Sequence, residues 1–338
     1  MKEVKVALIG FGGIARSHNK GYTILAEEKE PIKLVAVCDV NPKQFESQLS
    51  INIDTGKGGL PADVHTYTDV DELIAKEEFD MADICLPSYL HKEYAIKLME
   101  AGKDVLSEKP MALTSADCDE MIAASRRTGR KLMIGQCLRF DASYLFLKEC
   151  IDKGTFGKVR HVFMNRLSAQ PRWGFERWFE DDTKSGGCVM DMHIHDVDMA
   201  RFLLGEPEAV SLLALDGDTR WQVNNTRLYY KDAMVVLNGS WGEAATAKFS
   251  MNYRVRFEEA SVVFENGKVT VYPEKGEVYS PELPKTDRMA EEIRMFAHSI
   301  LDESVVNTNN PPESARQTVY VVEKLRESAA RNGEIVKL

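Results

Sequence analysis

The sequence predicts a doubly wound parallel α/β sheet in residues 1–136, followed by an α+β domain in residues 137–338. Short apolar runs alternate with helical patterns in the first half, whereas long strand-like runs follow one another in the second half. The length of 338 residues also exceeds what one hydrophobic core usually supports. We expect the second domain to contain a large, open and mainly antiparallel sheet.

The first half alternates between strands and helices, as repeated βα units require. Thr114 or Ser115 is expected to cap the helix that runs to residue 128, and Gly102 follows the end of the preceding helix. The region 43–66 contains Gly56, Gly58 and Gly59 and is expected to be a loop. The predicted strands are 4–9, 32–37, 81–86, 104–107 and 131–135, and the predicted helices include 90–101 and 115–128.

A glycine-rich turn follows the first strand directly. Residues 10–15 read Gly-Phe-Gly-Gly-Ile-Ala and match the pattern G-x-G-x-x-A. Gly10 would allow the tight turn, Gly12 would let the backbone approach a pyrophosphate, and Ala15 would permit close packing of helix on strand. The next helix offers its free N–H groups to phosphates. Strand, turn and helix together predict a Rossmann dinucleotide site.

Asp39 ends the second strand, 24 residues after Ala15, near the position of a ribose-binding acid. A carboxylate there accepts hydrogen bonds from both ribose hydroxyls and repels a 2′-phosphate, so we expect NAD as cofactor, with NADP less favoured. The alternative is a turn aspartate before Asn41 and Pro42.

Glu108-Lys109-Pro110 ends the strand at 104–107. A lysine at the carboxyl end of a strand in such a sheet points into the crevice where ligands bind. We therefore expect Lys109 to face the dinucleotide, although an ordinary turn would have the same composition.

The second half consists mainly of strands. Asn266-Gly267 is a strong hairpin signal between two of them. The predicted strands are 158–167, 208–216, 226–238, 244–256 and 259–272, and the predicted helices are 141–152, 287–301 and 313–331.

One candidate site lies between these strands, in a segment that reads as a glycine loop followed by a helix to Leu204. On one helix, Asp191 and His195 would share a face, with His195 as general acid or base and Asp191 orienting it. A buried histidine with a capping aspartate is the alternative. A metal site is not expected, because His193 and His195 would point in nearly opposite directions on a helix.

Residues 170–178 are rich in arginine and tryptophan. These side chains suit a loop that lines a sugar site, and they suit a subunit interface equally well.

Several ordered motifs together resemble the glucose–fructose oxidoreductase and inositol dehydrogenase-like (Gfo/Idh/MocA) family. They are Gly10-x-Gly12-x-x-Ala15, Ala101-Gly102-Lys103-x-Val105, Glu108-Lys109-Pro110, Arg139-Phe140, Gly186-Gly187 and Asp191-x-x-x-His195. The resemblance implies NAD(P)-dependent oxidation or reduction of sugars or polyols, and dimers or tetramers joined through the open sheet. It implies that Lys109, Asp191 and His195 line the substrate pocket. His193 stands where many members have glycine.

These inferences define the expected site. Lys109, His195 and Asp191 are expected to be catalytic. Residues expected to bind the cofactor are Gly10, Gly12, Gly13, Ile14, Asp39, Pro87, His91, Glu108 and Lys109; residues expected to bind substrate are Arg139, Arg172, Trp173, Trp178, Asp191 and His195. Two alternatives to a dehydrogenase stay open: an enzyme that oxidises its sugar only transiently, and a regulatory protein that binds without catalysis.

Composition limits the partners and the compartment. A net charge of −10 argues against general affinity for nucleic acid or anionic membranes. The six cysteines form no C-x-x-C pair, no run approaches the ~20 apolar residues of a membrane span, and the N-terminal apolar run is too short for a signal peptide. We therefore expect a cytoplasmic protein.

Overall fold

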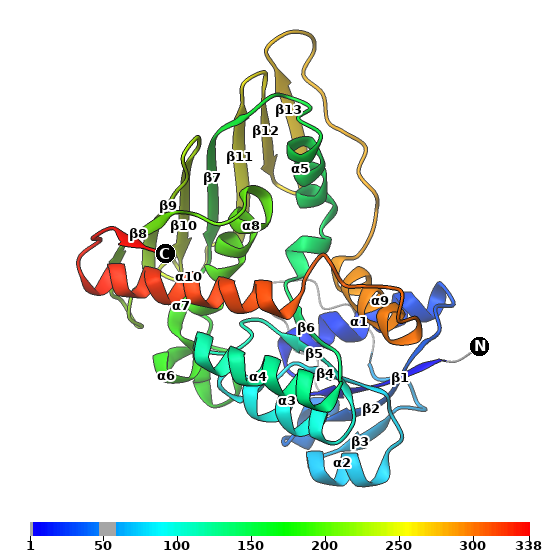
Figure 1. Ribbon diagram of the computed structural model, residues 1–338. Helices are drawn as coiled ribbons and strands as arrows, with labels where there is room; N and C mark the ends of the chain where they lie inside the picture. The colour runs from blue at the N-terminus through cyan, green and yellow to red at the C-terminus, as the bar shows by residue number, and fades with distance from the viewer. Residues whose placement is uncertain (1–2, 47–58) are drawn as a thin grey trace. The chain divides into compact units, whose positions relative to one another are not determined.

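The computed structural model describes residues 3–46 and 59–338, which form two compact units (Figure 1). The first unit contains the described residues up to Cys137 together with Trp173–Trp178 and Thr286–Arg316. The second contains Leu138–Arg172, Phe179–Lys285 and Gln317–Leu338. The sequence prediction placed every residue after 136 in the second domain, whereas the helix in Thr286–Arg316 packs with the first unit.

The first unit is built on a parallel six-stranded sheet in the order β3-β2-β1-β4-β5-β6, which confirms the doubly wound fold. Its strands are β1 (Val4–Ile9), β2 (Ile32–Cys38), β3 (His65–Tyr67), β4 (Met81–Ile84), β5 (Asp104–Glu108) and β6 (Leu132–Gly135). The short strand β3 was not predicted. Gly56 and Gly58 of the predicted loop lie outside the described residues.

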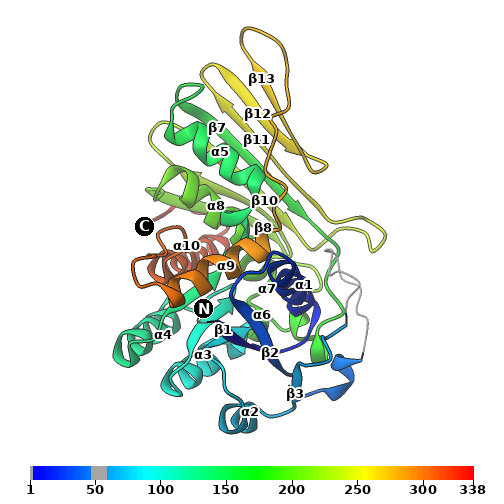
Figure 2. The same cartoon turned by 90° about the vertical axis from the view of Figure 1, so that its right-hand side faces the viewer.

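Helices cover both faces of this sheet (Figure 2). Helix α1 packs against α9 on one face, and α3 packs against α4 on the other. These elements are α1 (Gly13–Glu27), α2 (Val70–Lys76), α3 (His91–Glu100), α4 (Ser115–Thr128) and α9 (Arg288–Leu301), with short 3-10 turns at Pro42–Phe45 and Ser88–Leu90. The Thr114 side chain caps α4 as predicted. Because both faces are covered, β4 and β5 are buried throughout.

The second unit is built on an eight-stranded sheet in the order β13-β12-β11-β7-β10-β9-β8-β14. Strands β7 and β10 are parallel, and the other paired strands are antiparallel, which confirms the predicted class. The strands are β7 (Val159–Leu167), β8 (Ala209–Leu215), β9 (Val223–Tyr229), β10 (Met234–Ser240), β11 (Ser250–Phe257), β12 (Ala260–Glu265), β13 (Lys268–Pro273) and β14 (Val336–Lys337).

Two turns decide how the strands divide. At the predicted hairpin, Asn266 and Gly267 have φ values of 51° and 74°, the positive values that a type I′ turn requires. The run 226–238 was predicted as one strand, which is wrong: β9 and β10 are separate strands joined by a turn after Tyr229. No glycine or proline marks that turn, so the alternating pattern runs through it.

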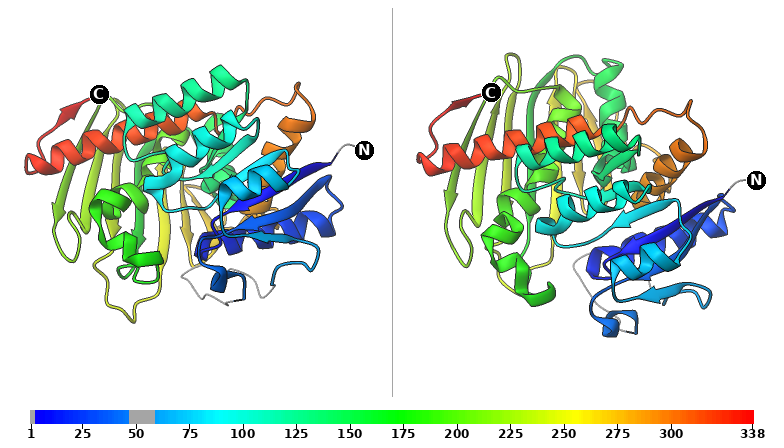
Figure 3. Two further views of the ribbon diagram at one scale, coloured as in Figure 1. Left: turned by 90° about the horizontal axis from the view of Figure 1, so that it is seen from below. Right: turned by 60° about the horizontal axis from the view of Figure 1, so that its bottom comes forward.

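Helices cover one face of the large sheet, and Figure 3 shows α10 running across its strands. Strand β11 is tied to α5 where the Tyr253 hydroxyl donates to the Ser143 carbonyl at 2.8 Å. The remaining helical segments of the described chain are η3 (Cys137–Phe140), α5 (Ala142–Asp152), η4 (Phe175–Glu180), α6 (Asp182–Ser185), α7 (Gly187–Asp191), α8 (Ile194–Leu204) and α10 (Pro312–Ala330). Within the described ranges, no helix has the length and apolar character needed to cross a membrane.

Candidate functional site

The glycine turn lies where β1 ends, beside the point at which the strand order reverses. Gly10 has φ +87°, and a Cβ atom there would lie 2.7 Å from the Cys85 carbonyl oxygen, so only glycine fits. A Cβ at Gly12 would meet no protein atom within 4 Å, which leaves room for a ligand. Gly13 and Ile14 begin α1, whose first N–H groups have no partner within the helix. These features fit a pyrophosphate at the α1 N-terminus.

Asp39 lies next to this turn, at the carboxyl end of β2. Its Oδ2 accepts the Phe11 N–H at 2.7 Å, and its Oδ1 accepts the Asn41 N–H at 2.8 Å. The carboxylate therefore both connects β2 to the glycine turn and orders the turn that follows. It is half-buried, and a carboxylate has further lone pairs that could accept ribose hydroxyls.

Lys109 follows β5, two strands from β1 in the same parallel sheet. The carboxyl ends of parallel strands meet at one edge, so Lys109, the glycine turn and Asp39 all belong to that edge. The Lys109 side chain is half-buried, and Pro87, which follows β4 at the same edge, is also half-buried. Both positions suit contact with a bound dinucleotide.

His91 is placed differently from the expectation. Its ring is 1% exposed, and Nδ1 and Nε2 lie 2.7 Å from the Pro110 carbonyl oxygen and 2.8 Å from the Leu86 carbonyl oxygen. The ring therefore joins the turn after β4 to the turn after β5. We assign it to the support of these turns rather than to direct cofactor contact.

Glu108 also differs from the expectation, because its carboxyl group faces the interior of the unit. It is 4% exposed; Oε1 lies 3.0 Å from His18 Nε2, and Oε2 accepts the Lys109 N–H at 3.1 Å. We therefore assign Glu108 to the support of Lys109 instead of to cofactor binding.

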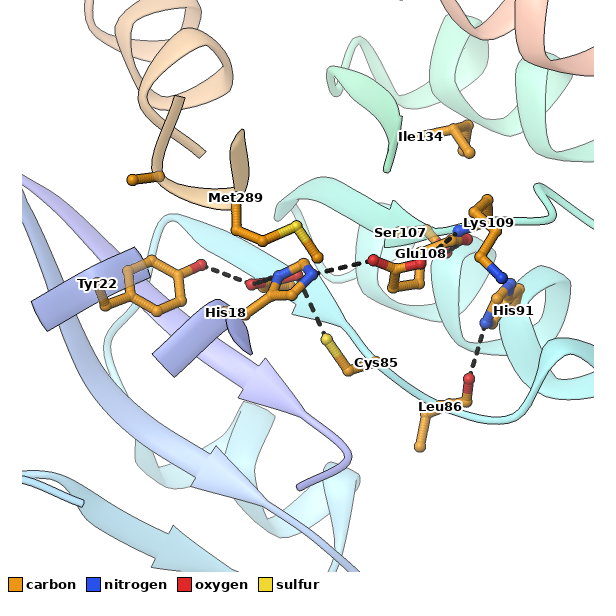
Figure 4. A network of polar contacts seen from close by, with 12 residues as sticks. His18, Tyr22, Cys85, Leu86, His91, Ser107, Glu108, Lys109, Ile134 and Met289 are labelled. Carbon is orange, nitrogen blue, oxygen red and sulfur yellow. Dashed lines mark hydrogen bonds and ion pairs between the residues drawn. The ribbon is translucent and has the colours of Figure 1, made fainter. Parts of the chain in front are cut away.

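Sequence reasoning missed the buried polar cluster to which Glu108 belongs. Figure 4 shows Tyr22, His18 and Glu108 in a row, with a contact between His18 and Glu108 and with Lys109 next to Glu108. His18 Nδ1 lies 2.8 Å from Asp83 Oδ2, which also accepts the Tyr22 hydroxyl at 2.7 Å. One signal was available: Asp83 is a carboxylate inside an apolar strand, and such a group needs buried partners.

Asp191 and His195 are not on one continuous helix, as the sequence analysis expected. Helix α7 ends at Asp191 and α8 begins at Ile194, with Met192 and His193 between them. Both side chains are half-buried, and both belong to the second unit. The continuous helix that the spacing argument assumed is therefore divided at Met192 and His193.

Buried anchors on each side hold this turn. The His193 ring is fully buried, and its Nε2 lies 2.8 Å from Thr226 Oγ1 on β9, so the ring is used in packing. Asp196 accepts from Arg166 Nη2 on β7 at 2.9 Å, in an ion pair that is also buried. His195 lies between these two anchors in sequence, and its backbone position is fixed by them.

The remaining predicted substrate residues fall into two groups. Arg139 is 3% exposed and donates from Nε and Nη2 to the two Asp198 oxygens at 2.8 and 2.7 Å. This buried bidentate pair joins η3 to α8, so Arg139 is a structural residue and we do not retain it as a substrate contact. Arg172 is exposed and pairs with Asp218, Trp173 is 38% exposed, and Trp178 is half-buried. These three remain predictions as substrate contacts.

Comparison with known proteins agrees with this architecture. A family model described as an oxidoreductase family with an NAD-binding Rossmann fold matches residues 4–136, and the GFO/IDH/MocA C-terminal domain matches residues 144–276. The chain belongs to the Gfo/Idh/MocA oxidoreductase family. The glycine turn and Lys109 lie in the first of these matched regions, and His195 lies in the second.

The matches to individual members of the family have low sequence identity. Myo-inositol 2-dehydrogenase of Thermotoga maritima is 26% identical and is matched over 96% of this chain and 84% of its own length. The 2,7-anhydro-N-acetylneuraminate hydratase of Mediterraneibacter gnavus is 31% identical over 63% of this chain, a match that spans 52% of that relative. A structure of levoglucosan dehydrogenase with NADH and L-sorbose matches with a TM-score of 0.83 at 18% identity, covering 100% of this chain and 99% of that one. At this identity the likeness shows the fold.

Proposed function

We propose that this member of the family is an NAD-dependent dehydrogenase acting on a secondary alcohol of a sugar, a polyol or a related hydroxy compound. The observation that carries the proposal is the meeting of the glycine turn, Asp39 and Lys109 at one edge of the parallel sheet. When bound there, NAD would accept the hydride of the alcohol carbon. Gly10, Gly12, Gly13, Ile14 and Asp39 would hold it, with Pro87 and Lys109 facing it.

The chain's own residues would manage the proton and the charge. Oxidation of an alcohol requires removal of the hydroxyl proton, and an imidazole is suited to accept it near neutral pH. We assign this step to His195, with Asp191 orienting the ring or the substrate. Lys109 would donate a hydrogen bond to the same oxygen and stabilise its developing negative charge. Lys109 is also a candidate for the base itself.

Asp39 favours NAD over NADP. Its carboxylate already holds the glycine turn and is half-buried beside it, where a 2′-phosphate would meet a second negative charge.

A second candidate function is suggested by one relative. The Mediterraneibacter gnavus protein is named a hydratase, and addition of water changes no net oxidation state. A reaction of this kind would use the bound dinucleotide only transiently, so no net NADH would accumulate.

We further propose that the open face of the large sheet binds a second copy of the chain, giving a homodimer or homotetramer. Four asparagines cross this face in register, one on each of four strands. Asn225 donates to Asn238, Asn238 to Asn165, and Asn165 to Asn252, at 2.7–2.8 Å. This row satisfies most of its own polar groups, so a second copy of the chain could cover it without leaving them unpaired.

Apolar side chains surround the asparagine row, among them Leu215, Val223 and Met234, which are 70%, 40% and 55% exposed. Covering such side chains would stabilise a dimer. A Met234→Lys variant should therefore lower the mass measured by light scattering, and a monomeric wild-type protein would refute the interface.

We also propose that the protein resides in a reducing compartment, such as the cytoplasm. All six cysteines are free and buried, and burial raises the pKa of the Cys85 and Cys137 thiols to about 12. Such thiols are poor nucleophiles, and none of the six cysteines forms a disulfide.

One screen tests the proposed function. The protein is incubated with NAD and a panel of sugars and polyols, while NADH absorbance and product are followed separately. Net NADH supports a dehydrogenase. Product without NADH supports the transient reaction, and binding without either outcome supports a regulatory protein.

A further inference from the structure

A buried histidine in the first unit contacts Glu108, the residue that precedes Lys109. His18 is fully buried on α1, and each of its ring nitrogens faces a carboxylate, Asp83 Oδ2 at 2.8 Å and Glu108 Oε1 at 3.0 Å. A carboxylate oxygen only accepts hydrogen bonds, so both nitrogens must donate. With Asp83 and Glu108 both ionised, this geometry is that of an imidazolium held between two carboxylates, which makes both hydrogen bonds charge-assisted.

The charges around the ring agree with this state. Burial alone would lower the pKa of His18, but the charge of Asp83 overcomes it and the pKa is raised well above the ordinary value. Burial alone would raise the pKa of Glu108, but the hydrogen bond and charge of His18 lower it. Both shifts agree with a positive ring beside a negative Glu108.

A fourth buried group completes the set. Glu292 on α9 is fully buried, and neither of its carboxyl oxygens has a hydrogen-bond partner among the described residues. A Cβ at Gly135 would lie 3.2 Å from Glu108 Oε1 and 3.3 Å from Glu292 Oε1, so the two carboxyl groups flank the same glycine. Burial, followed by the charge of Glu108, raises the pKa of Glu292 well above its ordinary value. The neutral form of Glu292 is therefore favoured, which leaves the negative charge on Glu108.

The contact of His18 with Glu108 connects the cluster to Lys109. We propose that His18, as an imidazolium, is a positioning residue: it fixes Glu108, whose second oxygen holds the Lys109 N–H at 3.1 Å, and so sets where the lysine side chain leaves β5. The proposal rests on the proposed function, in which Lys109 contacts the reacting oxygen. The groups that face His18 are Asp83 and Cys85 from the β4 side, Glu108 from β5 and Glu292 from α9.

A metal ion is the competing explanation, because His18, Glu108 and Glu292 offer ligand atoms within 4.8 Å of one another. The hydrogen-bond distances favour the imidazolium. An ion bound at His18 Nε2 would remove the hydrogen that the contact with Glu108 requires.

The variants His18→Gln and Glu108→Gln test the proposal, since each removes one side of the charged contact and keeps a similar shape. Tyr22→Phe is the matched control: it removes a hydrogen bond to Asp83 in the same cluster and leaves the contact between His18 and Glu108. On a confirmed substrate, His18→Gln and Glu108→Gln should each lower kcat by about tenfold or more, with NAD affinity and KM within about threefold of wild type. Tyr22→Phe should keep kcat within about threefold.

A double-mutant cycle shows whether the effect passes through Lys109. In a Lys109→Met background, His18→Gln should lower kcat little further, because the group that it positions is gone. Full additivity, or wild-type kcat in folded His18→Gln, would overturn the positioning role. If Lys109→Met itself kept wild-type turnover, the proposed function would fail instead.

A readout that needs no substrate keeps the test independent of activity. In protein with reductively methylated lysines, the Lys109 NMR signal is assigned by its loss in Lys109→Met and titrated with NAD bound. Its shift and titration should change in Glu108→Gln and His18→Gln and stay the same in Tyr22→Phe. Unchanged signals in both test variants, or a stoichiometric metal in purified protein that His18→Gln removes, would overturn the proposal.

Discussion

Buried His193 should make the stability of the second unit depend on pH. Burial is the main reason that the pKa of His193 falls from 6.5 to about 4; the charge of Asp196 opposes it only partly. Between these values the unfolded chain binds a proton at this position and the folded chain does not, so stability is full above pH 6.5 and falls as the pH falls. The expected loss is about 1.4 kcal/mol one pH unit below 6.5 and about 2.5 kcal/mol two units below it.

Urea unfolding of wild type and His193→Gln at a series of pH values measures this loss. The variant lacks the titrating ring, so the wild-type advantage in unfolding free energy should shrink by about 2.5 kcal/mol over that range. Thr226→Val is the control, because it removes the partner of Nε2 but keeps the buried imidazole. Thr226→Val should lower the free energy of unfolding by about 1 kcal/mol and leave its dependence on pH as in wild type. A constant difference between wild type and His193→Gln would refute the reasoning.

Three further predictions concern the turn, the cofactor and the second unit. Gly10→Ala should destabilise the protein and abolish NAD binding, measured by calorimetry, because its Cβ would lie 2.7 Å from the Cys85 carbonyl oxygen; wild-type affinity would contradict this. Asp39→Ala should reduce the ratio of NAD to NADP affinity, and a native protein that prefers NADP would show that the argument from this carboxylate is wrong. Arg139→Met should cost about 3–5 kcal/mol in urea unfolding because it leaves Asp198 buried without its main partner, so a loss below about 1 kcal/mol would count against a structural role.

The sequence predicts those parts of the fold whose signals are local. Thr114 caps α4, Gly102 follows α3 with φ +82°, and the Asn266-Gly267 turn lies between β12 and β13. Each of these signals depends on a few neighbouring residues and on the conformations that they can adopt.

The errors arise where distant residues decide the structure. No glycine or proline marks the break at Met192 and His193, and it is the burial of the His193 ring against Thr226 that accompanies it. Pairing of Arg139 with Asp198 likewise joins residues far apart in sequence, so an arginine in a family motif was read as a substrate contact.

In the candidate site, too, the residues with local sequence signals could be predicted and those brought together by the fold could not. The glycine turn and Asp39 could be placed because strand, turn and acid follow one another at a fixed spacing. The buried polar cluster next to Lys109 could not be placed, because its members come from four separate elements. They are His18, Asp83, Glu108 and Glu292. Only the carboxylate inside apolar strand β4 indicated that such a cluster exists.

Hydride transfer by the wild type, Lys109→Met and His195→Asn tests the central claim most directly. Single-turnover NADH formation is measured on a substrate found in the screen, after NAD binding has been verified for each variant. If Lys109 and His195 handle the proton and the charge on the reacting oxygen, each variant should be slower by ~100-fold or more. Near wild-type rates in both variants would contradict the assignment.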